Sequence, residues 1–262
     1  MKKYMMIALA VLLFVPSLAF SNTLSFKINY FIPRLEYKSI DYDFMKTEFA
    51  QMDFRRRNFE DTSFGVFYEY FFDGRFSLVV GLDTFSKSKA GYYKDFVGYS
   101  FEDGDFAYPS DFYGDFVPGH TLDISITPIQ LSFKVAPLGR RASFIPYFGG
   151  GVSMVLWNLR LRGQIVDFSQ PFLDENPDYG PVIYYPITSR DALEGESFGR
   201  VSLGYQLFGG AMLPIGNRLT LDAEFKYFHA TGKLEKAFQG FEPYNLFDLA
   251  GYQISIGINY WF

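Results

Sequence analysis

The chain has 262 residues, a formal charge of −5 and a mean hydropathy close to zero. It contains no cysteine, which excludes disulfides, thiolate metal sites and a lipid-anchored N-terminal cysteine. The acidic balance also argues against a nucleic-acid partner, because binding to phosphates favours clustered basic charge.

The N-terminal segment has the pattern of a secretory signal. Lys2 and Lys3 precede an apolar run, residues 4–15, that is too short to span a bilayer, and small residues surround Ala19. We expect residues 1–21 to be a cleaved signal peptide and residues 22–262 to form one domain. A retained membrane anchor is the alternative. Cleavage removes two lysines, which takes the formal charge from −5 to −7.

The first three predicted strands alternate apolar and polar residues, as half-buried strands do. They cover residues 24–30, 64–70 and 76–83. Asp73-Gly74 separates the second from the third and predicts a two-residue hairpin turn, because both residue types tolerate positive φ.

The fourth predicted strand, residues 122–135, changes its phase. Its apolar residues are even-numbered up to Ile126 and odd-numbered from Ile129 onward. Keeping one face in lipid would require one extra residue, so we predict a β-bulge at Thr127-Pro128, where proline is tolerated.

Four further alternating segments follow, and the connections between strands alternate in length. The segments are residues 145–159, 200–207, 219–227 and 251–262, and the long connections are residues 33–62, 86–120, 162–198 and 230–248. Short turns on one rim and long polar loops on the other are typical of outer-membrane barrels. Loops 33–62 and 162–198 are long enough to contain another hairpin, which would make ten strands.

After the signal, no apolar stretch is long enough for a membrane helix. A membrane-spanning chain without helices must form a closed barrel, because lipid cannot satisfy the polar groups of an open sheet edge. We therefore predict an all-β fold, an eight-stranded antiparallel up-and-down transmembrane β-barrel with both termini periplasmic. A soluble barrel with its apolar rows turned inward around a ligand is the alternative.

With the apolar rows in lipid, nine charged side chains face the lumen: Lys27, Glu69, Asp83, Asp123, Lys134, Arg200, Asp222, Glu224 and Lys226. Buried charges are costly unless they are paired, and this set is nearly balanced. One interpretation is a salt-bridged plug. The other is a narrow conduit lined by small residues, among them Gly149, Gly151, Ser153, Ser202 and Gly204.

The mature chain resembles the small outer-membrane barrels of the OmpA, OmpX and OmpW type. The segments that carry the resemblance are Pro146–Val152, Asp222–Tyr227 and Gly251–Phe262. It implies a bacterial outer-membrane location and contact with lipid and lipopolysaccharide. It also implies a C-terminal signal for the assembly machinery, formed by Tyr252, Ile254, Ile256, Ile258, Tyr260 and Phe262. Members of this group are structural, adhesive or narrow channels, and fold alone does not select among these roles.

The long loops are the expected place for a specific function. Residues 92–116 interleave aromatic rings with carboxylates, which suits an extracellular ligand, weak calcium binding or an ordered rim. Arg55, Arg56 and Arg57 would meet lipopolysaccharide phosphates or form a solvated run that pairs with nearby carboxylates.

A catalytic function has little support. His229-Ala-Thr231 is similar to the His-x-Ser of outer-membrane lipid A deacylases, with Glu235 or Glu242 as a third member, but threonine replaces the nucleophilic serine. We expect no enzyme, no cofactor and no metal. The predicted role is structural or surface-binding through the long loops, with a narrow channel for small or hydrophobic solutes as the alternative.

Overall fold

The computed structural model describes residues 22–34, 52–168, 170–176, 180–190, 200–233 and 246–262. The predicted signal peptide lies outside these residues. Apart from one short 3₁₀ helix, η1 (Arg56–Phe59), every described element is a strand. None of the described helices is long and apolar enough to cross a membrane.

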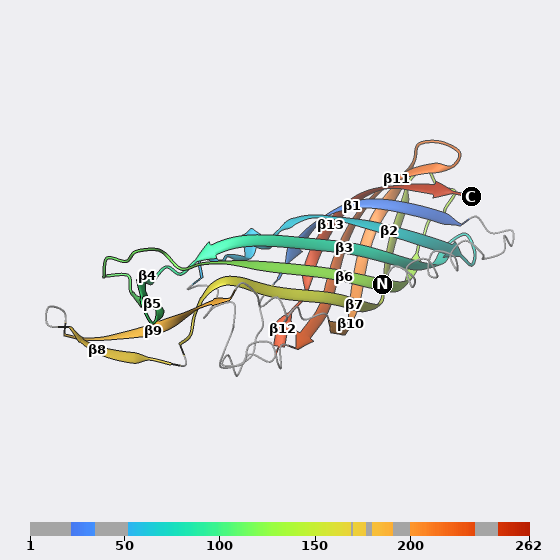
Figure 1. The fold of residues 1–262 in the computed structure, drawn as a ribbon. Coiled ribbons are helices and arrows are strands. Elements are labelled where there is room, and N and C mark those ends of the chain that lie inside the picture. Colours follow the sequence, from blue (N-terminus) through green and yellow to red (C-terminus); the bar gives the residue numbers. More distant parts are fainter. Residues whose placement is uncertain (1–21, 35–51, 169, 177–179, 191–199, 234–245) are drawn as a thin grey trace.

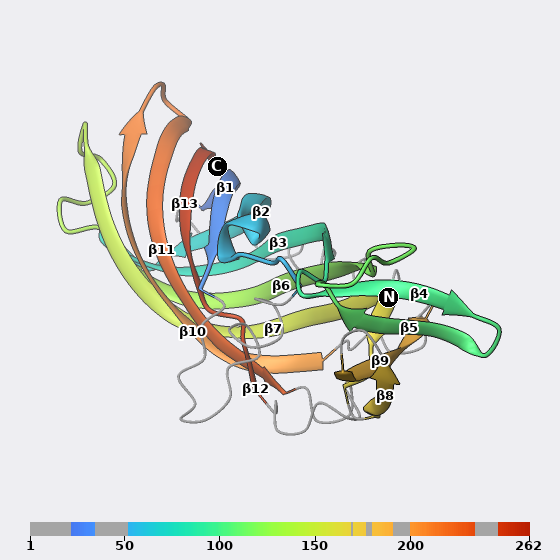
Figure 2. The same ribbon diagram turned by 90° about the vertical axis from the view of Figure 1, so that its left-hand side faces the viewer.

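Eight strands close into an antiparallel barrel (Figures 1 and 2). In order around the wall they are β10 (Arg200–Pro214), β11 (Leu219–Lys233), β13 (Gly251–Trp261), β1 (Thr23–Pro33), β2 (Asp61–Phe71), β3 (Phe76–Tyr92), β6 (Gly119–Val135) and β7 (Ile145–Val166). β7 pairs with β10 from Ile145–Met212 to Trp157–Arg200, which closes the ring. The predicted eight-stranded barrel is therefore confirmed, and the ten-stranded alternative is wrong.

The outer wall carries a continuous apolar band. On β13 the even-numbered residues face outward, and Ile254, Ile256 and Ile258 are 50–69% exposed, whereas Ser255 and Asn259 are 1% exposed. The ten residue steps from Tyr252 to Phe262 span about 26 Å at ~3.4 Å per residue and ~40° tilt, close to the height of a lipid-facing band. A soluble barrel would not expose such a band.

One end of the barrel, here called the turn end, holds the short connections 72–75, 136–144 and 215–218 together with Asn22 and Phe262. The predicted two-residue hairpin turn at Asp73-Gly74 is wrong, because neither residue has positive φ. Instead a four-residue turn forms, in which Asp73 Oδ1 accepts hydrogen bonds from the backbone N–H groups of Arg75 (2.6 Å) and Phe76 (2.9 Å).

At the opposite end, here called the loop end, β3, β6 and β7 extend beyond the other strands of the barrel (Figure 1). The predicted β-bulge at Thr127-Pro128 is absent, because β6 pairs with β7 in one unbroken register from His120 to Val135. The even-numbered residues of β6 face inward throughout. Lys134 and Gln130 are buried near the turn end, and Ile126 is buried nearer the loop end.

The change of phase in the sequence therefore marks where the wall leaves the membrane-facing band. The band covers residues 129–135 of β6, and beyond it the apolar side chains turn inward. A loop-end core of 19 buried residues forms there. Its largest side chains include Met52, Phe59, Tyr93, Leu122, Trp157 and Leu161. Each buried large apolar side chain contributes about 1.5–3 kcal/mol, so this part of the chain folds around its own core.

The loop end also carries a small sheet, here called the loop-end sheet. It consists of β4 (Phe96–Phe101), β5 (Gly104–Pro109), β9 (Gly180–Arg190) and β8 (Phe172–Asn176), hydrogen-bonded in that order (Figure 1). β9 also pairs with the end of β7, which fixes the sheet to the barrel. Loops 86–120 and 162–198, predicted as polar connections, therefore contain regular hairpins. The short strand β12 (Leu246–Asp248) pairs with β11.

Candidate functional site

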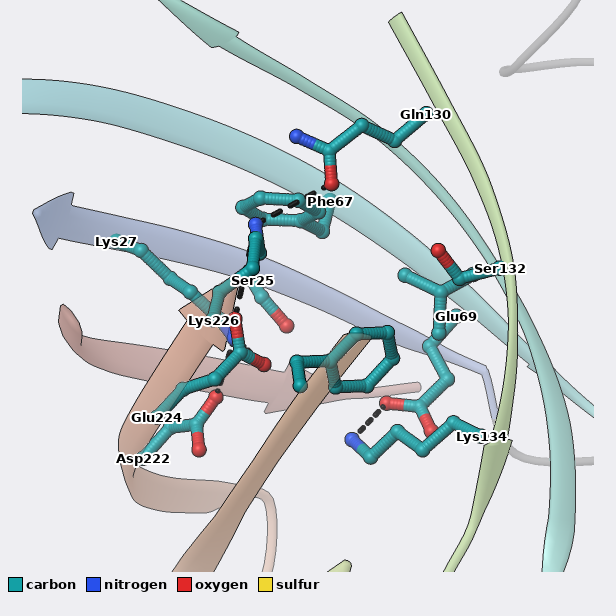
Figure 3. Close-up of a pocket in the computed structure, with 12 residues that line it drawn as sticks. Ser25, Lys27, Phe67, Glu69, Gln130, Ser132, Lys134, Asp222, Glu224 and Lys226 are labelled. Atoms are coloured by element: carbon teal, nitrogen blue, oxygen red, sulfur yellow. Dashed lines mark hydrogen bonds and ion pairs between the residues drawn. The ribbon is translucent and has the colours of Figure 1, made fainter. Parts of the chain in front are cut away.

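The lumen near the turn end contains seven of the nine predicted charged side chains, all at most 8% exposed. This lumen charge cluster consists of Lys27, Glu69, Asp83, Lys134, Asp222, Glu224 and Lys226. Figure 3 shows all of them except Asp83. It contains three cations and four carboxylates, contributed by five strands around the wall. The alternation of faces brings them together, since every inward position of these strands points to the same axis.

Each lysine of the cluster lies against a carboxylate of another strand. Lys27 Nζ is 2.9 Å from Asp222 and 2.7 Å from Glu224. Lys134 Nζ is 2.8 Å from Glu69, and Lys226 Nζ is 3.0 Å from Asp83. These ion pairs join strands that do not adjoin one another in the wall, so they cross the lumen rather than follow it.

Neutral polar groups complete the cluster. The hydroxyl of Tyr147 lies 2.6 Å from Asp222 and 3.0 Å from Glu224, and its one proton can be donated to either carboxylate. Asp83 accepts hydrogen bonds from Asn29 Nδ2 at 3.1 Å and from Gln130 Nε2. These donors offset the excess of one carboxylate, as buried charges require.

Phe67 fills the centre of the lumen, a role that the sequence analysis did not assign. A Cβ on Gly81 would overlap the Phe67 ring, and a Cβ on Gly65 would lie 2.7 Å from it, so the two glycines form a slot for the ring. The ammonium groups of Lys226 and Lys27 lie 4.7 and 5.1 Å from the ring centroid. The sequence signal is a bulky inward residue opposite inward glycines.

The space beside the glycines of the predicted conduit is also filled by neighbouring side chains. A Cβ on Gly149 would lie 2.5 Å from the Phe208 ring, and one on Gly204 would lie 2.9 Å from the hydroxyl of Ser153. Between the side chains of the charge cluster, the remaining cavity has a volume of about 20 Å³. That volume holds about one water molecule.

Apolar side chains close the lumen toward the loop end. A second cavity of about 20 Å³ lies between Asp83 and Lys226 of the cluster and the side chains of Phe31, Phe85 and Phe228. Phe31 and Phe85 pack with ring centroids 4.7 Å apart. The inside of the barrel is thus closed twice, by paired charges and by aromatic rings.

Two predicted lumen charges differ from this arrangement. Asp123 lies on the outer face of β6, beyond the apolar band, where its carboxylate pairs with Arg162 at 2.9 Å. Its placement in the lumen was wrong because the phase change of β6 is not a bulge. Arg200 pairs with Trp157 in the strand register, but its side chain lies outside the described residues.

The outward face of the loop-end sheet carries a stack of aromatic rings. Tyr108 of β5 and Tyr184 of β9 stack at a centroid distance of 4.8 Å and an angle of 5°, and Phe172 of β8 continues the stack at 5.4 Å and 22°. Phe106 contacts Tyr184 edge-on at 5.4 Å. The opposite face of the sheet packs against the loop-end core through Ala107, which is fully buried.

This ring stack is fixed yet accessible. Hydrogen bonds between strands hold its backbone, and Phe172 and Phe101 at its margins are 44% and 53% exposed. Asp174 faces the same side as Phe172, two residues along β8, and is exposed. An exposed aromatic surface bordered by carboxylates is characteristic of binding surfaces rather than of a solvated loop.

The arginines predicted to contact lipopolysaccharide lie at the start of η1, next to Glu60. Arg55, Arg56 and Arg57 are all exposed, and Arg56 is 3.9 Å from Glu60. Glu60 accepts a hydrogen bond of 3.2 Å from the hydroxyl of Tyr30, whose ring belongs to the band. Contact with lipopolysaccharide stays a prediction.

The candidate catalytic histidine lies on the outer wall, away from the lumen charge cluster. His229 faces outward on β11 and packs against the rings of Tyr205 and Tyr227, with centroids 5.0 and 6.5 Å away. Its Nδ1 has no hydrogen-bond partner among the described residues, so no orienting acid is seen there. Glu235 and Glu242 lie outside the described residues. Within the described chain no group of three or more His, Asp or Glu side chains could hold a metal ion.

Comparison of the sequence with protein-family models and with curated proteins gives no match. Solved structures of outer-membrane barrels are similar in fold. The outer membrane protein OprG from Pseudomonas aeruginosa has a TM-score of 0.47 and 14% identity, covering 93% of this chain and 96% of that one. Ail, the attachment invasion locus protein of Yersinia pestis, solved with the heparin analogue sucrose octasulfate, has a TM-score of 0.43 and 9% identity, covering 94% and 100%. Neisserial surface protein A has a TM-score of 0.43 and 11% identity, covering 93% and 97%. The chain is an eight-stranded antiparallel β-barrel, as the closed register of its own strands shows.

Proposed function

We propose that this protein is a closed outer-membrane barrel that holds a binding surface, the aromatic face of the loop-end sheet, outside the cell. The turn end is then periplasmic and the loop end extracellular. The observation that carries the proposal is the contrast between the two ends of the same strands. The membrane-facing part is filled by paired charges, whereas the part beyond the band is built around a separate core.

A channel is the less favoured function. Two cavities that the described residues enclose inside the barrel hold about one water molecule each, and charged and aromatic side chains line them. A conducting state would require several buried ion pairs to break together. Removing one partner of such a pair costs about 3–5 kcal/mol, which makes spontaneous opening rare.

The aromatic face fits recognition of a ligand that offers flat apolar surfaces together with hydroxyl or amide groups. Tyrosine supplies a large contact area at low entropic cost and a hydroxyl at the tip of its ring. Tyr108 and Tyr184 are already held by their stacking, so binding need not order them. Polysaccharide chains and glycoproteins offer such groups, and they are accessible at a cell surface.

A binding array tests this proposal. The refolded protein in lipid nanodiscs would be applied to immobilised polysaccharides and glycoproteins, beside a variant with Tyr108→Ser and Tyr184→Ser. We expect at least one saturable binder of the wild type that the double variant loses by tenfold or more. The matched control is Tyr113→Ser, because Tyr113 is 93% exposed in the same region but does not belong to the ring stack. Equal binding by all three proteins would contradict the assignment.

Two membrane partners complete the proposal. Arg55 and Arg57 are exposed at the start of η1, and arginine binds phosphate such as that of lipopolysaccharide through paired N–H donors. Diphosphoryl lipid A should bind more tightly than its monophosphoryl form, and this difference should shrink in a variant with Arg55→Gln and Arg57→Gln.

The outward row of β13 ending at Phe262 would be read by the assembly machinery, and Phe262→Ser should slow membrane insertion without changing the refolded barrel.

A further inference from the structure

The turn end carries a cavity of about 750 Å³, far larger than those inside the barrel. Its volume lies within the range of about 300–1,000 Å³ that small-molecule sites occupy. Three arginines line it from two different turns: Arg140 and Arg141 between β6 and β7, and Arg218 between β10 and β11. No acidic side chain is among its lining residues, although the chain as a whole is acidic.

The wall of this cavity is built from ordered groups. Trp261 stacks on Phe71 with ring centroids 5.2 Å apart and donates a hydrogen bond of 3.3 Å to Thr220 Oγ1. The guanidinium of Arg140 lies 5.6 Å from the centre of the same Phe71 ring. Arg218 Nη1 donates to the hydroxyl of Tyr260 at 3.4 Å, next to the apolar band. Arg140 and Arg218 are therefore held in place by contacts with ordered aromatic side chains.

A second observation places these arginines beside lipid. Each of the three short turns carries a large apolar side chain in an exposed position: Phe72 at 47%, Leu138 at 63% and Ile215 at 56%. Exposed apolar residues at the tip of a turn are expected where the turn enters the interfacial layer of a membrane. In that layer the nearest anions are the phosphates of lipid headgroups.

We infer that the turn-end cavity binds the phosphate of a phospholipid headgroup from the adjacent leaflet, with Arg141 and Arg218 as its principal ligands. This inference rests on the proposed membrane setting and adds a specific lipid site to it. A phosphate offers several acceptor oxygens to the paired N–H donors of arginine, and the acyl chains would lie along Leu138 and Ile215. The site would anchor the turn end in its leaflet.

Native mass spectrometry of the protein in detergent micelles tests the inference with three probes: phosphatidylglycerol, diacylglycerol and glycerol phosphate. They supply lipid with phosphate, lipid without phosphate and phosphate without lipid. The wild type should retain phosphatidylglycerol at least tenfold better than either other probe. A variant with Arg141→Gln and Arg218→Gln should lose roughly tenfold of this retention, because both guanidinium groups contact the phosphate.

The matched control is Arg75→Gln, because Arg75 lies on the same rim but does not line the cavity. It should retain phosphatidylglycerol as the wild type does. Equal retention by the wild type and the double variant would overturn the inference, as would an equal loss in Arg75→Gln, which would indicate general charge attraction. Equal binding of glycerol phosphate and phosphatidylglycerol would overturn the lipid source and leave a soluble phosphate as the ligand. Binding at the aromatic face should be the same in the double variant, so failure of this site and failure of the proposed function are distinguishable.

Discussion

The ammonium group of Lys134 lies 2.8 Å from the carboxylate of Glu69 inside the barrel, and both residues are at most 5% exposed. On the outer face of the projecting strands, Arg162 and Asp123 lie 2.9 Å apart, with side chains 45% and 27% exposed. The two pairs have similar lengths and differ in burial. Comparing the stability that each pair contributes therefore measures the effect of burial on an ion pair in this barrel.

We expect Lys134→Ala to lower the free energy of unfolding by about 3–5 kcal/mol, because it leaves the buried carboxylate of Glu69 without its cation. Arg162→Ala should cost no more than ~1 kcal/mol, since its pair is exposed to water. Urea unfolding of the barrel in lipid vesicles measures both. Lys134→Met combined with Glu69→Leu should recover most of the loss. If Lys134→Ala and Arg162→Ala lowered the free energy of unfolding equally, the charge-paired lumen would be contradicted.

The slot around Phe67 predicts a specific coupling. Gly81→Ala should destabilise the barrel by about 1–3 kcal/mol, because the added methyl group overlaps the ring. In a Phe67→Ala background the same substitution should cost little, and a double-mutant cycle with urea unfolding measures the difference. Gly209→Ala is the control, since its nearest neighbour would be 3.6 Å away. Additive effects of Gly81→Ala and Phe67→Ala would show that the ring does not occupy the slot.

His120 makes the loop-end core sensitive to pH. Burial between Phe54 and Tyr93 lowers the pKa of His120 from 6.5 to about 4, and its Nε2 lies 3.3 Å from the carbonyl oxygen of Met52. His120 binds a proton more readily in the unfolded core than in the folded one. The neutral side chain therefore allows the core its full stability above about pH 6.5. This stability is lost as the pH falls toward 4, by a total of about 3 kcal/mol.

Fluorescence of Trp157, in a Trp261→Phe background, reports the opening of this core, because Trp157 is one of its buried residues. Comparison of the wild type with His120→Phe removes the contribution of carboxylates that titrate in the same range. The difference in stability between the two proteins should change between pH 6.5 and 4 and be constant above pH 7. A difference that is constant over the whole range would show that His120 titrates normally in the folded core.

The strands of the barrel were predictable from the sequence because each alternates apolar and polar residues along its membrane-facing part. Lys27, Glu69 and Glu224 could be assigned to the lumen on that periodicity alone, since a strand has only two faces. The partners within the lumen could not be assigned. Which lysine meets which carboxylate depends on the stagger of strands around the barrel, and period-two alternation carries no information about stagger.

The error at Thr127-Pro128 has a different cause. The sequence of β6 changes phase because the solvent outside the wall changes from lipid to water while the backbone register stays constant. A change of environment and an inserted residue produce the same pattern in one strand. The same change near Leu156 and Trp157 of β7, read beside β6, would have indicated the end of the band, since one bulge does not alter two strands.

The double closure predicts that removal of lumen charges alone does not open the barrel. Lys134→Ala combined with Glu224→Ala should remain silent in planar bilayers, because Phe31, Phe85 and Phe228 still close the loop side. Large-to-small substitution of these rings in the same background should produce conductance. Discrete current steps from the charge variant by itself would show that the aromatic closure is not a barrier.

The central claim is that the barrel is closed and serves as an anchor, and conductance of the refolded wild type in a planar bilayer tests it most directly. Cavities of about 20 Å³ inside the lumen predict a current that is indistinguishable from that of the bare bilayer. Reproducible discrete steps from the wild type, at concentrations where folding is verified, would contradict the claim and would favour a solute channel.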